Sequence, residues 1–278
     1  MADVKKTVTG AAPAAKASNQ SGNTMLINLG IVIACIAVAH IIFHFVFGSK
    51  SNFHDETMHA AKNLMGTVYL GGWVVPILMS TFLVMLSFLI ERALTIFKAR
   101  GKISNAEFIR KVQFHLSSKN IDAAVAECDK QAGSVGNVMK AGLKKYKEMT
   151  TNSELDTEQK IAQIKKEVEE TTALELPMLE KNLVFLSTIT SAATLLGLFG
   201  TVLGMIRAFA AMANAGAPDA NALAQGISEA LVNTALGIGT SFLAMIAYNF
   251  YTTIIDNVTF GIDESGFTLE QSFLANYK

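Results

Sequence analysis

Four stretches of the chain are strongly apolar over lengths that suit a membrane: residues 25–47, 69–97, 183–213 and 222–256. A helix needs about 20 apolar residues to cross the ~30 Å hydrocarbon core of a bilayer. Few charged residues interrupt these stretches, whereas charges crowd the segments between them. The pattern therefore predicts an all-α, polytopic membrane protein with four transmembrane helices.

The long polar segment 98–182 is expected to form a helical domain outside the bilayer. Ile161, Ile164 and Val168 recur there at helical spacing among lysines and glutamates, which is typical of an amphipathic helix. Pro177 should kink this helix or mark where two helices abut. The last two apolar stretches are ~45–50 Å long as helices, so both should extend from the bilayer into this domain as continuous rods.

The remaining segments are expected to be connections and tails. Residues 1–24 are polar and small, which predicts a disordered tail. Residues 48–68 form a polar connector, 214–221 a short turn and 257–278 a C-terminal tail. Lysines and arginines precede the first span and follow the second. The positive-inside rule then places both termini and the helical domain in the cytoplasm, and the connector and the turn in the periplasm.

Composition narrows the function classes further. Only 17% of the residues are charged, against about a quarter in a typical soluble domain. The net charge of zero gives no reason to expect a nucleic-acid partner. The sequence contains no phosphate-binding glycine loop, nucleophile elbow or cysteine ligand set, so we expect no enzyme activity, no cofactor and no metal.

Two residue pairs are better explained by structure than by chemistry. His40 and His44 have the i, i+4 spacing of metal ligands, but without a third ligand we favour packed or interfacial histidines. Cys35 lies in an apolar run and Cys128 in a charged helix. We therefore expect two structural thiols rather than a disulfide.

The third span carries an unusual row of polar and small residues. Four hydroxyls are spaced four, three and seven residues apart, which places them on one helical face: Ser187, Ser191, Thr194 and Thr201. Gly197, Gly200 and Gly204 would let another helix approach closely. The hydroxyl row could line a pore, or it could hold helices together without conducting anything.

The fourth span carries a second polar row and an acid. Gln225, Glu229 and Asn233 follow one another every four residues. Thr234 lies 12 residues after Ala222, and Thr201 lies 12 residues before Ala213. Both hydroxyls are thus ~18 Å from the turn, level with each other in an antiparallel pair.

Glu229 lies only ~10 Å from the turn, within the apolar zone. An acid there must face protein or water, and such sites often bind and release protons. Arg207 is expected to reach the membrane interface; a structural Arg207–Glu229 pair is the alternative.

Three segments carry a family resemblance: residues 176–180 (LPMLE), 195–205 (LLGLFGTVLGM) and 226–231 (GISEAL), with Thr234 following. Together they resemble the MotA/TolQ/ExbB proton-channel family, most of all its ExbB members, over roughly residues 70–260. Two features depart from the family pattern. Ala193-Thr194 stands where Ala-Pro is common, and residues 25–47 add a span to the usual three.

The resemblance implies a subunit of an inner-membrane motor in a bacterium. ExbB-like subunits form a pentamer around the single-span helices of an ExbD-like dimer. The complex uses the proton motive force to energise a TonB-like protein for transport across the outer membrane. By position, Thr201 and Thr234 would be pore-lining threonines and Glu229 the family's intramembrane glutamate, while the proton-carrying aspartate belongs to the ExbD-like partner.

Other interpretations stay open at this point. A TolQ-like or gliding/motility-type stator would use the same chemistry with different partners. A scaffold that conducts nothing is a further alternative. Hydroxyl rows suit either a proton path or sodium coordination.

Overall fold

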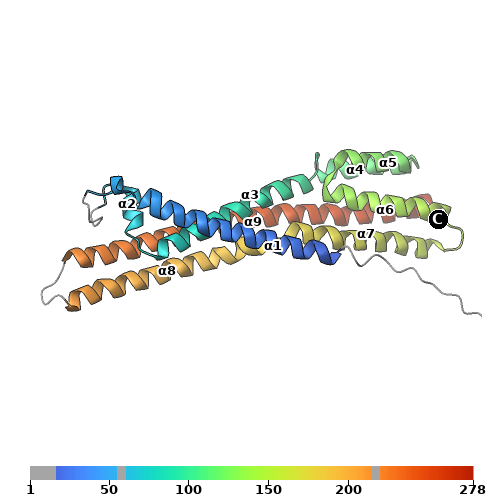
Figure 1. The fold of residues 1–278 in the computed structure, drawn as a ribbon. Helices are drawn as coiled ribbons and strands as arrows, with labels where there is room; N and C mark the ends of the chain where they lie inside the picture. The colour runs from blue at the N-terminus through green and yellow to red at the C-terminus, as the bar shows by residue number, and fades with distance from the viewer. Residues whose placement is uncertain (1–16, 55–60, 215–219, 278) are drawn as a thin grey trace, which may run out of the picture. The chain divides into compact units, whose positions relative to one another are not determined.

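A computed structural model describes residues 17–54, 61–214 and 220–277, and these residues are almost entirely helical (Figure 1). Their one β interaction is an isolated bridge between Phe53 and Ala61. Four helices within the described ranges are long and apolar enough to cross a membrane. The predicted all-α, polytopic membrane fold with four spans is confirmed.

The chain divides into two compact units, of which the first combines residues 1–84 with residues 204–232. Its helices are α1 (Ala17–Ile41), the π-helical turn η1 (Ile42–Phe47), the 3₁₀ turn η2 (Lys50–Asn52), α2 (Leu64–Tyr69) and the start of α3 (Val74–Ala99). The end of α8 (Leu183–Asn214) and the start of α9 (Ala220–Asn276) complete it.

Asn52 organises the connector that follows the first span. Its buried side-chain amide donates hydrogen bonds to the carbonyls of Val46 (2.7 Å) and Phe47 (3.1 Å). These are carbonyls at a helix end, which have no partner within the helix. The Asn63 amide donates in turn to the Asn52 side-chain oxygen (3.0 Å). The connector is therefore folded onto the end of η1, although its residues 55–60 lie outside the described part.

Two predicted boundaries at this end of the chain are wrong. Residues 17–24 are helical rather than disordered, because the spanning helix α1 extends toward the N-terminus as far as Ala17 with its backbone hydrogen bonds intact. Residues 1–16 lie outside the described part. The second span begins at Val74 rather than at residue 69. Tyr69 belongs to α2, and Gly72 adopts a positive φ of 77° that ends the connection.

The second unit combines residues 85–203 with residues 233–278. Besides parts of α3, α8 and α9, it contains α4 (Asn105–Ser117), α5 (Ile121–Gln131), α6 (Gly133–Thr151) and α7 (Thr157–Glu180). Figure 1 shows α4 to α7 beside the C-terminal, red end of α9. Gln113 on α4 donates a hydrogen bond to the Thr268 hydroxyl of α9 (3.2 Å), and Gly142 on α6 packs against Leu269.

The break between α5 and α6 lies at Ala132 and Gly133. Both residues have positive φ angles, 53° and 77°, and Gly133 adopts this conformation without the cost that a side chain would add. Gly136, by contrast, lies inside α6. A single glycine reduces helix stability only by about 1 kcal/mol, which packing of the buried residues around it offsets.

The helices on either side of α8 differ from their predicted ends. α7 continues through Pro177, and the helix breaks at Lys181–Asn182 instead, where Asn182 has a φ of 64°. The Pro177 carbonyl still accepts a hydrogen bond from the Lys181 N–H (3.1 Å), so the proline does not end the helix. α9 runs through the predicted span 222–256 and through residues 257–276 of the predicted tail as one helix. Of the predicted turn 214–221, residues 215–219 lie outside the described part.

Candidate functional site

A pair of threonines joins α8 to α9 within the second unit. The Thr201 and Thr234 hydroxyls lie in direct hydrogen-bond contact. The Thr201 hydroxyl also lies 3.2 Å from the Gly197 carbonyl one turn earlier. Both threonines are half-buried. The two hydroxyls thus share one level, as the helix lengths predict, while their part in an ion pathway stays a prediction.

Glycines bring the two helix backbones together beside this pair. A Cβ atom added to Gly237 would lie 2.6 Å from the Ala193 carbonyl oxygen, and one added to Gly197 would lie 2.9 Å from the Asn233 carbonyl oxygen. The fully buried Asn233 side chain rests on Gly200, where an added Cβ would lie 2.5 Å from the Asn233 Cβ. These distances leave no room for side chains. The geometry therefore favours helix packing as the role of Gly197 and Gly200.

Thr201 lies at this contact between α8 and α9, but two other members of the predicted row of hydroxyls do not. Ser191 and Thr194 are exposed, and the Ser191 hydroxyl donates to the Thr188 carbonyl of its own helix (3.2 Å). Ser241 on α9, which the spacing patterns did not single out, is buried and donates to the Thr190 carbonyl. The sequence signal that could have found this contact was a serine on one helix facing a glycine-rich neighbouring helix. Three spacings on one helix cannot tell which face meets a partner.

An ion pair joins α8 to α9 within the first unit. Arg207 Nη1 lies 2.5 Å from Glu229 Oε1. The Glu229 side chain is 8% exposed and that of Arg207 49%. The expectation that Arg207 reaches the interface instead of pairing is therefore wrong. Arg207 lies seven residues before the end of α8 and Glu229 nine residues after the start of α9, so the two are within ~3 Å of the same level and the arginine side chain spans the remainder.

Backbone closes over this ion pair from the connector side. A Cβ added to Gly72 would overlap the Glu229 carboxylate and lie 3.2 Å from Arg207 Nη1. On α8 and α9, Gly204 and Gly226 meet so closely that a Cβ added to either would lie 2.8 Å from the carbonyl oxygen of the other. Gln225 is half-buried one turn before Glu229. Glu229 is thus the buried half of a charge pair whose arginine is half exposed, and not an isolated intramembrane acid.

Arg92 is a buried cation that no sequence pattern singled out. It is 2% exposed, and its Nη1 donates to the carbonyls of Leu179 (3.1 Å) and Met178 (3.3 Å) at the end of α7. Its Nε donates to the Glu91 carboxylate (2.6 Å), which also accepts from the Asn182 amide (3.3 Å). Together these contacts satisfy carbonyls that the helix break leaves without partners. The sequence signal that could have found this site was the pair of adjacent opposite charges, Glu91 and Arg92, near the end of the second span.

The surroundings of the cysteines and histidines fit structural rather than chemical roles. Neither cysteine forms a disulfide. Cys128 is 2% exposed, and burial raises the pKa of its thiol to about 12, with the neighbouring Asp129 carboxylate adding to the effect. His40 Nδ1 lies 2.9 Å from the Ile36 carbonyl, and His44 is exposed in η1. In the described part of the chain, no three metal-ligating side chains gather at one point.

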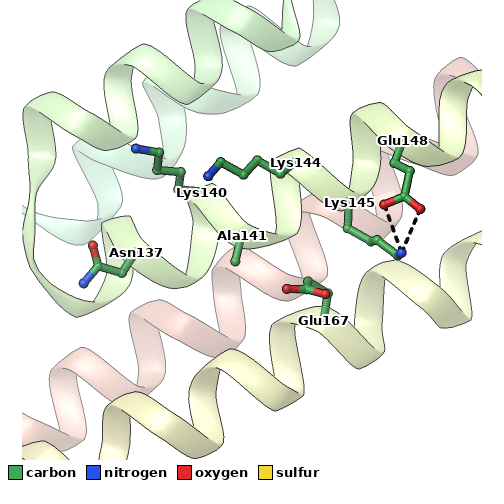
Figure 2. Close-up of a pocket in the computed structure, with 7 residues that line it drawn as sticks. All are labelled: Asn137, Lys140, Ala141, Lys144, Lys145, Glu148 and Glu167. Atoms are coloured by element: carbon green, nitrogen blue, oxygen red, sulfur yellow. Dashed lines mark hydrogen bonds and ion pairs between the residues drawn. The ribbon is translucent and has the colours of Figure 1, made fainter. Parts of the chain in front are cut away.

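A lysine-lined groove of about 350 Å³ lies along α6 and faces α7 (Figure 2). Most of its charges are already matched. The Lys145 ammonium lies 3.0 Å from both Glu148 oxygens, and Lys140 pairs with Asp129. Figure 2 shows Lys145 turned toward Glu148 and away from Lys140 and Lys144. Exposed pairs of this kind contribute little to stability, and the groove is a solvated surface.

A family model described as the MotA/TolQ/ExbB proton channel family matches residues 130–264. The match covers just under half of the chain, so residues 130–264 are similar to members of that family. The match contains the threonine pair, the Arg207–Glu229 ion pair and the glycine seam. The resemblance inferred from three short segments is thereby confirmed for the MotA/TolQ/ExbB family as a whole.

Curated relatives carry both TolQ and ExbB names. The Tol-Pal system protein TolQ of Pseudomonas aeruginosa is 32% identical over 127 residues, which is 43% of this chain and 55% of the relative. TolQ of Haemophilus influenzae is 41% identical over 75 residues (27% and 33%). The biopolymer transport protein ExbB of Helicobacter pylori is 45% identical over 71 residues (26% and 49%). The chain thus spans about a third to a half of the length of these relatives.

Proposed function

We propose that this protein is the ring-forming subunit of an ion-driven motor in the bacterial inner membrane. An ExbB-like subunit would act with a single-span, ExbD-like dimer and would energise a TonB-like transducer for transport across the outer membrane. The chain would supply the polar wall of the ion path and would carry out no catalysis. Both termini and the α4–α7 bundle would face the cytoplasm.

The contact between Thr201 and Thr234 carries this proposal. Two hydroxyls at one level, on helices held backbone to backbone by glycines, present oxygen ligands at a fixed position in an apolar zone. Such oxygens can relay a proton or coordinate a cation. The two hydroxyls already contact each other. A single chain would therefore form only one side of an ion path. A ring of copies around a partner helix with an acidic residue would complete it.

The Arg207–Glu229 ion pair changes the part proposed for Glu229. With Arg207 2.5 Å away, the carboxylate balances a cation of its own chain. We therefore propose that Glu229 stabilises the wall and its charge balance, and that the proton carrier belongs to the partner.

Isosteric variants test the conducting role. Thr201→Val and Thr234→Val keep the side-chain shape and remove the hydroxyl. Each should abolish partner-dependent ion flux in proteoliposomes without changing the subunit number measured by native mass spectrometry. Thr253→Val is a matched control, because that hydroxyl is exposed on α9 and donates to the Asn249 carbonyl of its own helix (2.9 Å). Full flux in both pore variants would instead support a non-conducting scaffold.

A TolQ-like role is the second candidate, since two of the relatives described above carry the TolQ name. Partner identity separates the two roles. The tagged protein should be purified from its native membrane and its single-span partner sequenced. Recovery of a Tol-Pal component would replace the ExbB-like proposal, and recovery of a TonB-like protein would support it.

A further inference from the structure

A groove of about 430 Å³ lies between the α3–α4 connection and α9 within the second unit. It runs from Phe250 to Glu264 along α9, a distance of ~20 Å. Arg100 and Ser104 line its opposite side. None of these residues takes part in the threonine pair or the Arg207–Glu229 ion pair.

The groove begins at the level where α3 leaves the bilayer. The Tyr251 hydroxyl donates to the Leu89 carbonyl (2.8 Å), which sets this part of α9 beside the apolar end of the second span. Leu94 and Phe97 are 72% and 52% exposed on α3. Exposed apolar side chains of this size belong in lipid, and the basic residue Lys98 follows them at once, which marks the headgroup level.

The two ends of the groove differ in chemistry. Phe250 is 52% exposed at the bilayer end, and Ile254 and Val258 form an apolar floor. Arg100 is exposed at the rim and takes part in none of the ion pairs formed by the described residues. Lys98 and Lys102 are exposed beside it. An apolar floor that continues the membrane surface, with an unmatched cation at headgroup height, fits an amphiphile with a negative head.

We propose that this groove binds an anionic phospholipid, whose phosphate pairs with Arg100 and whose acyl chain lies on Phe250 and Ile254. Arginine suits this role because its planar guanidinium donates two parallel hydrogen bonds to a phosphate. Glu264 lies at the far end of the groove, so a second negative group would be disfavoured there. The proposal is independent of the motor function.

Native mass spectrometry of the full-length protein tests this directly. The protein, in detergent micelles, is offered phosphatidylglycerol or phosphatidylcholine with identical acyl chains. Wild-type protein should retain phosphatidylglycerol at least about fivefold better, because a basic residue near an anionic lipid surface contributes ~1 kcal/mol. Arg100→Gln should abolish this preference. Phe250→Ala should weaken the binding of both lipids.

Arg110→Gln is the matched control. Arg110 is an exposed arginine on α4 that does not line the groove, so its loss should leave the lipid preference unchanged. An equal loss in Arg100→Gln and Arg110→Gln would show general charge attraction and overturn the proposal. Absence of any preference in the wild-type protein would overturn it as well.

Native mass spectrometry also tests two other possible occupants of the groove. If a second copy of the chain covered the groove, Arg100→Gln or Phe250→Ala would lower the subunit number, and the proposal would fail. If the site only recognised a free phosphate group, glycerophosphoglycerol, which lacks acyl chains, would displace the lipid. The lipid proposal predicts that it does not.

Discussion

Replacing Arg92 with alanine should destabilise the protein more than replacing any exposed arginine. The guanidinium is buried and holds two carbonyls at the end of α7 together with the Glu91 carboxylate. The buried Leu179 carbonyl costs at least ~1 kcal/mol when it is left without a donor, and the part-buried Met178 carbonyl adds less. Glu91 is 36% exposed, so its loss of a partner adds only about 1 kcal/mol. With the lost packing of a large buried side chain, we expect a total of about 3–5 kcal/mol.

The assay is thermal unfolding in detergent, followed by circular dichroism. For a chain of this size 1 kcal/mol corresponds to about 2–4 °C in Tm, so Arg92→Ala should melt about 6–20 °C below the wild-type protein. Arg110→Ala, on the exposed face of α4, should change Tm by no more than about 2 °C. Glu91→Gln should produce a smaller loss than Arg92→Ala, because the carbonyls keep their donor. If Arg92→Ala melted with the Arg110→Ala control, the inferred role of the junction would be wrong.

Three further outcomes follow from the described contacts. Glu229→Gln should lower Tm by several degrees because Arg207 is left unpaired, and adding Arg207→Gln should restore at least half of the loss; additive losses would argue against the pair. Gly237→Val should disrupt the hairpin, since even a Cβ would lie 2.6 Å from a backbone oxygen, whereas Gly239→Ala should be tolerated because its surroundings are open. Cys128 should resist maleimide at pH 7 in the folded protein and react after denaturation, because burial keeps its thiol protonated; rapid labelling of the native protein would contradict this.

Helices and their membrane character could be predicted from the sequence because they depend on local runs. The apolar stretches, the amphipathic spacing of Ile161 and Val168, and the equal distances of Thr201 and Thr234 from the turn all follow from helical geometry. Hairpin partners joined by a short turn must be antiparallel, so residue counts alone give the levels of their side chains. That comparison succeeded for the threonines, and the same arithmetic would have found Arg207 opposite Glu229.

Contacts that depend on long-range packing could not be predicted. Arg92 sits at the end of a span and reads as an interfacial charge until α7 is placed beside it. Ser191 and Thr194 have the spacing of a polar face, yet both are exposed. Periodicity identifies the face of a helix, but it does not say which neighbour that face contacts. The helix breaks at Asn182 rather than at Pro177 because Arg92 and Glu91 of α3 bind the Leu179 carbonyl and the Asn182 amide at the break. Propensity alone favours a break at the proline.

The Arg92 junction also sets an order of events during synthesis. Its acceptors Met178 and Leu179 follow Arg92 by 86 and 87 residues, which at about 5–20 residues per second takes a ribosome roughly 4–17 s. Throughout this interval the second span is already made, but its buried cation has no carbonyls to bind. Helices α4 to α6 and most of α7 must emerge first, and only then can the chain lock α7 onto α3. A nascent chain that stalls before residue 178 would therefore leave Arg92 accessible to water, lipid headgroups or quality-control proteases.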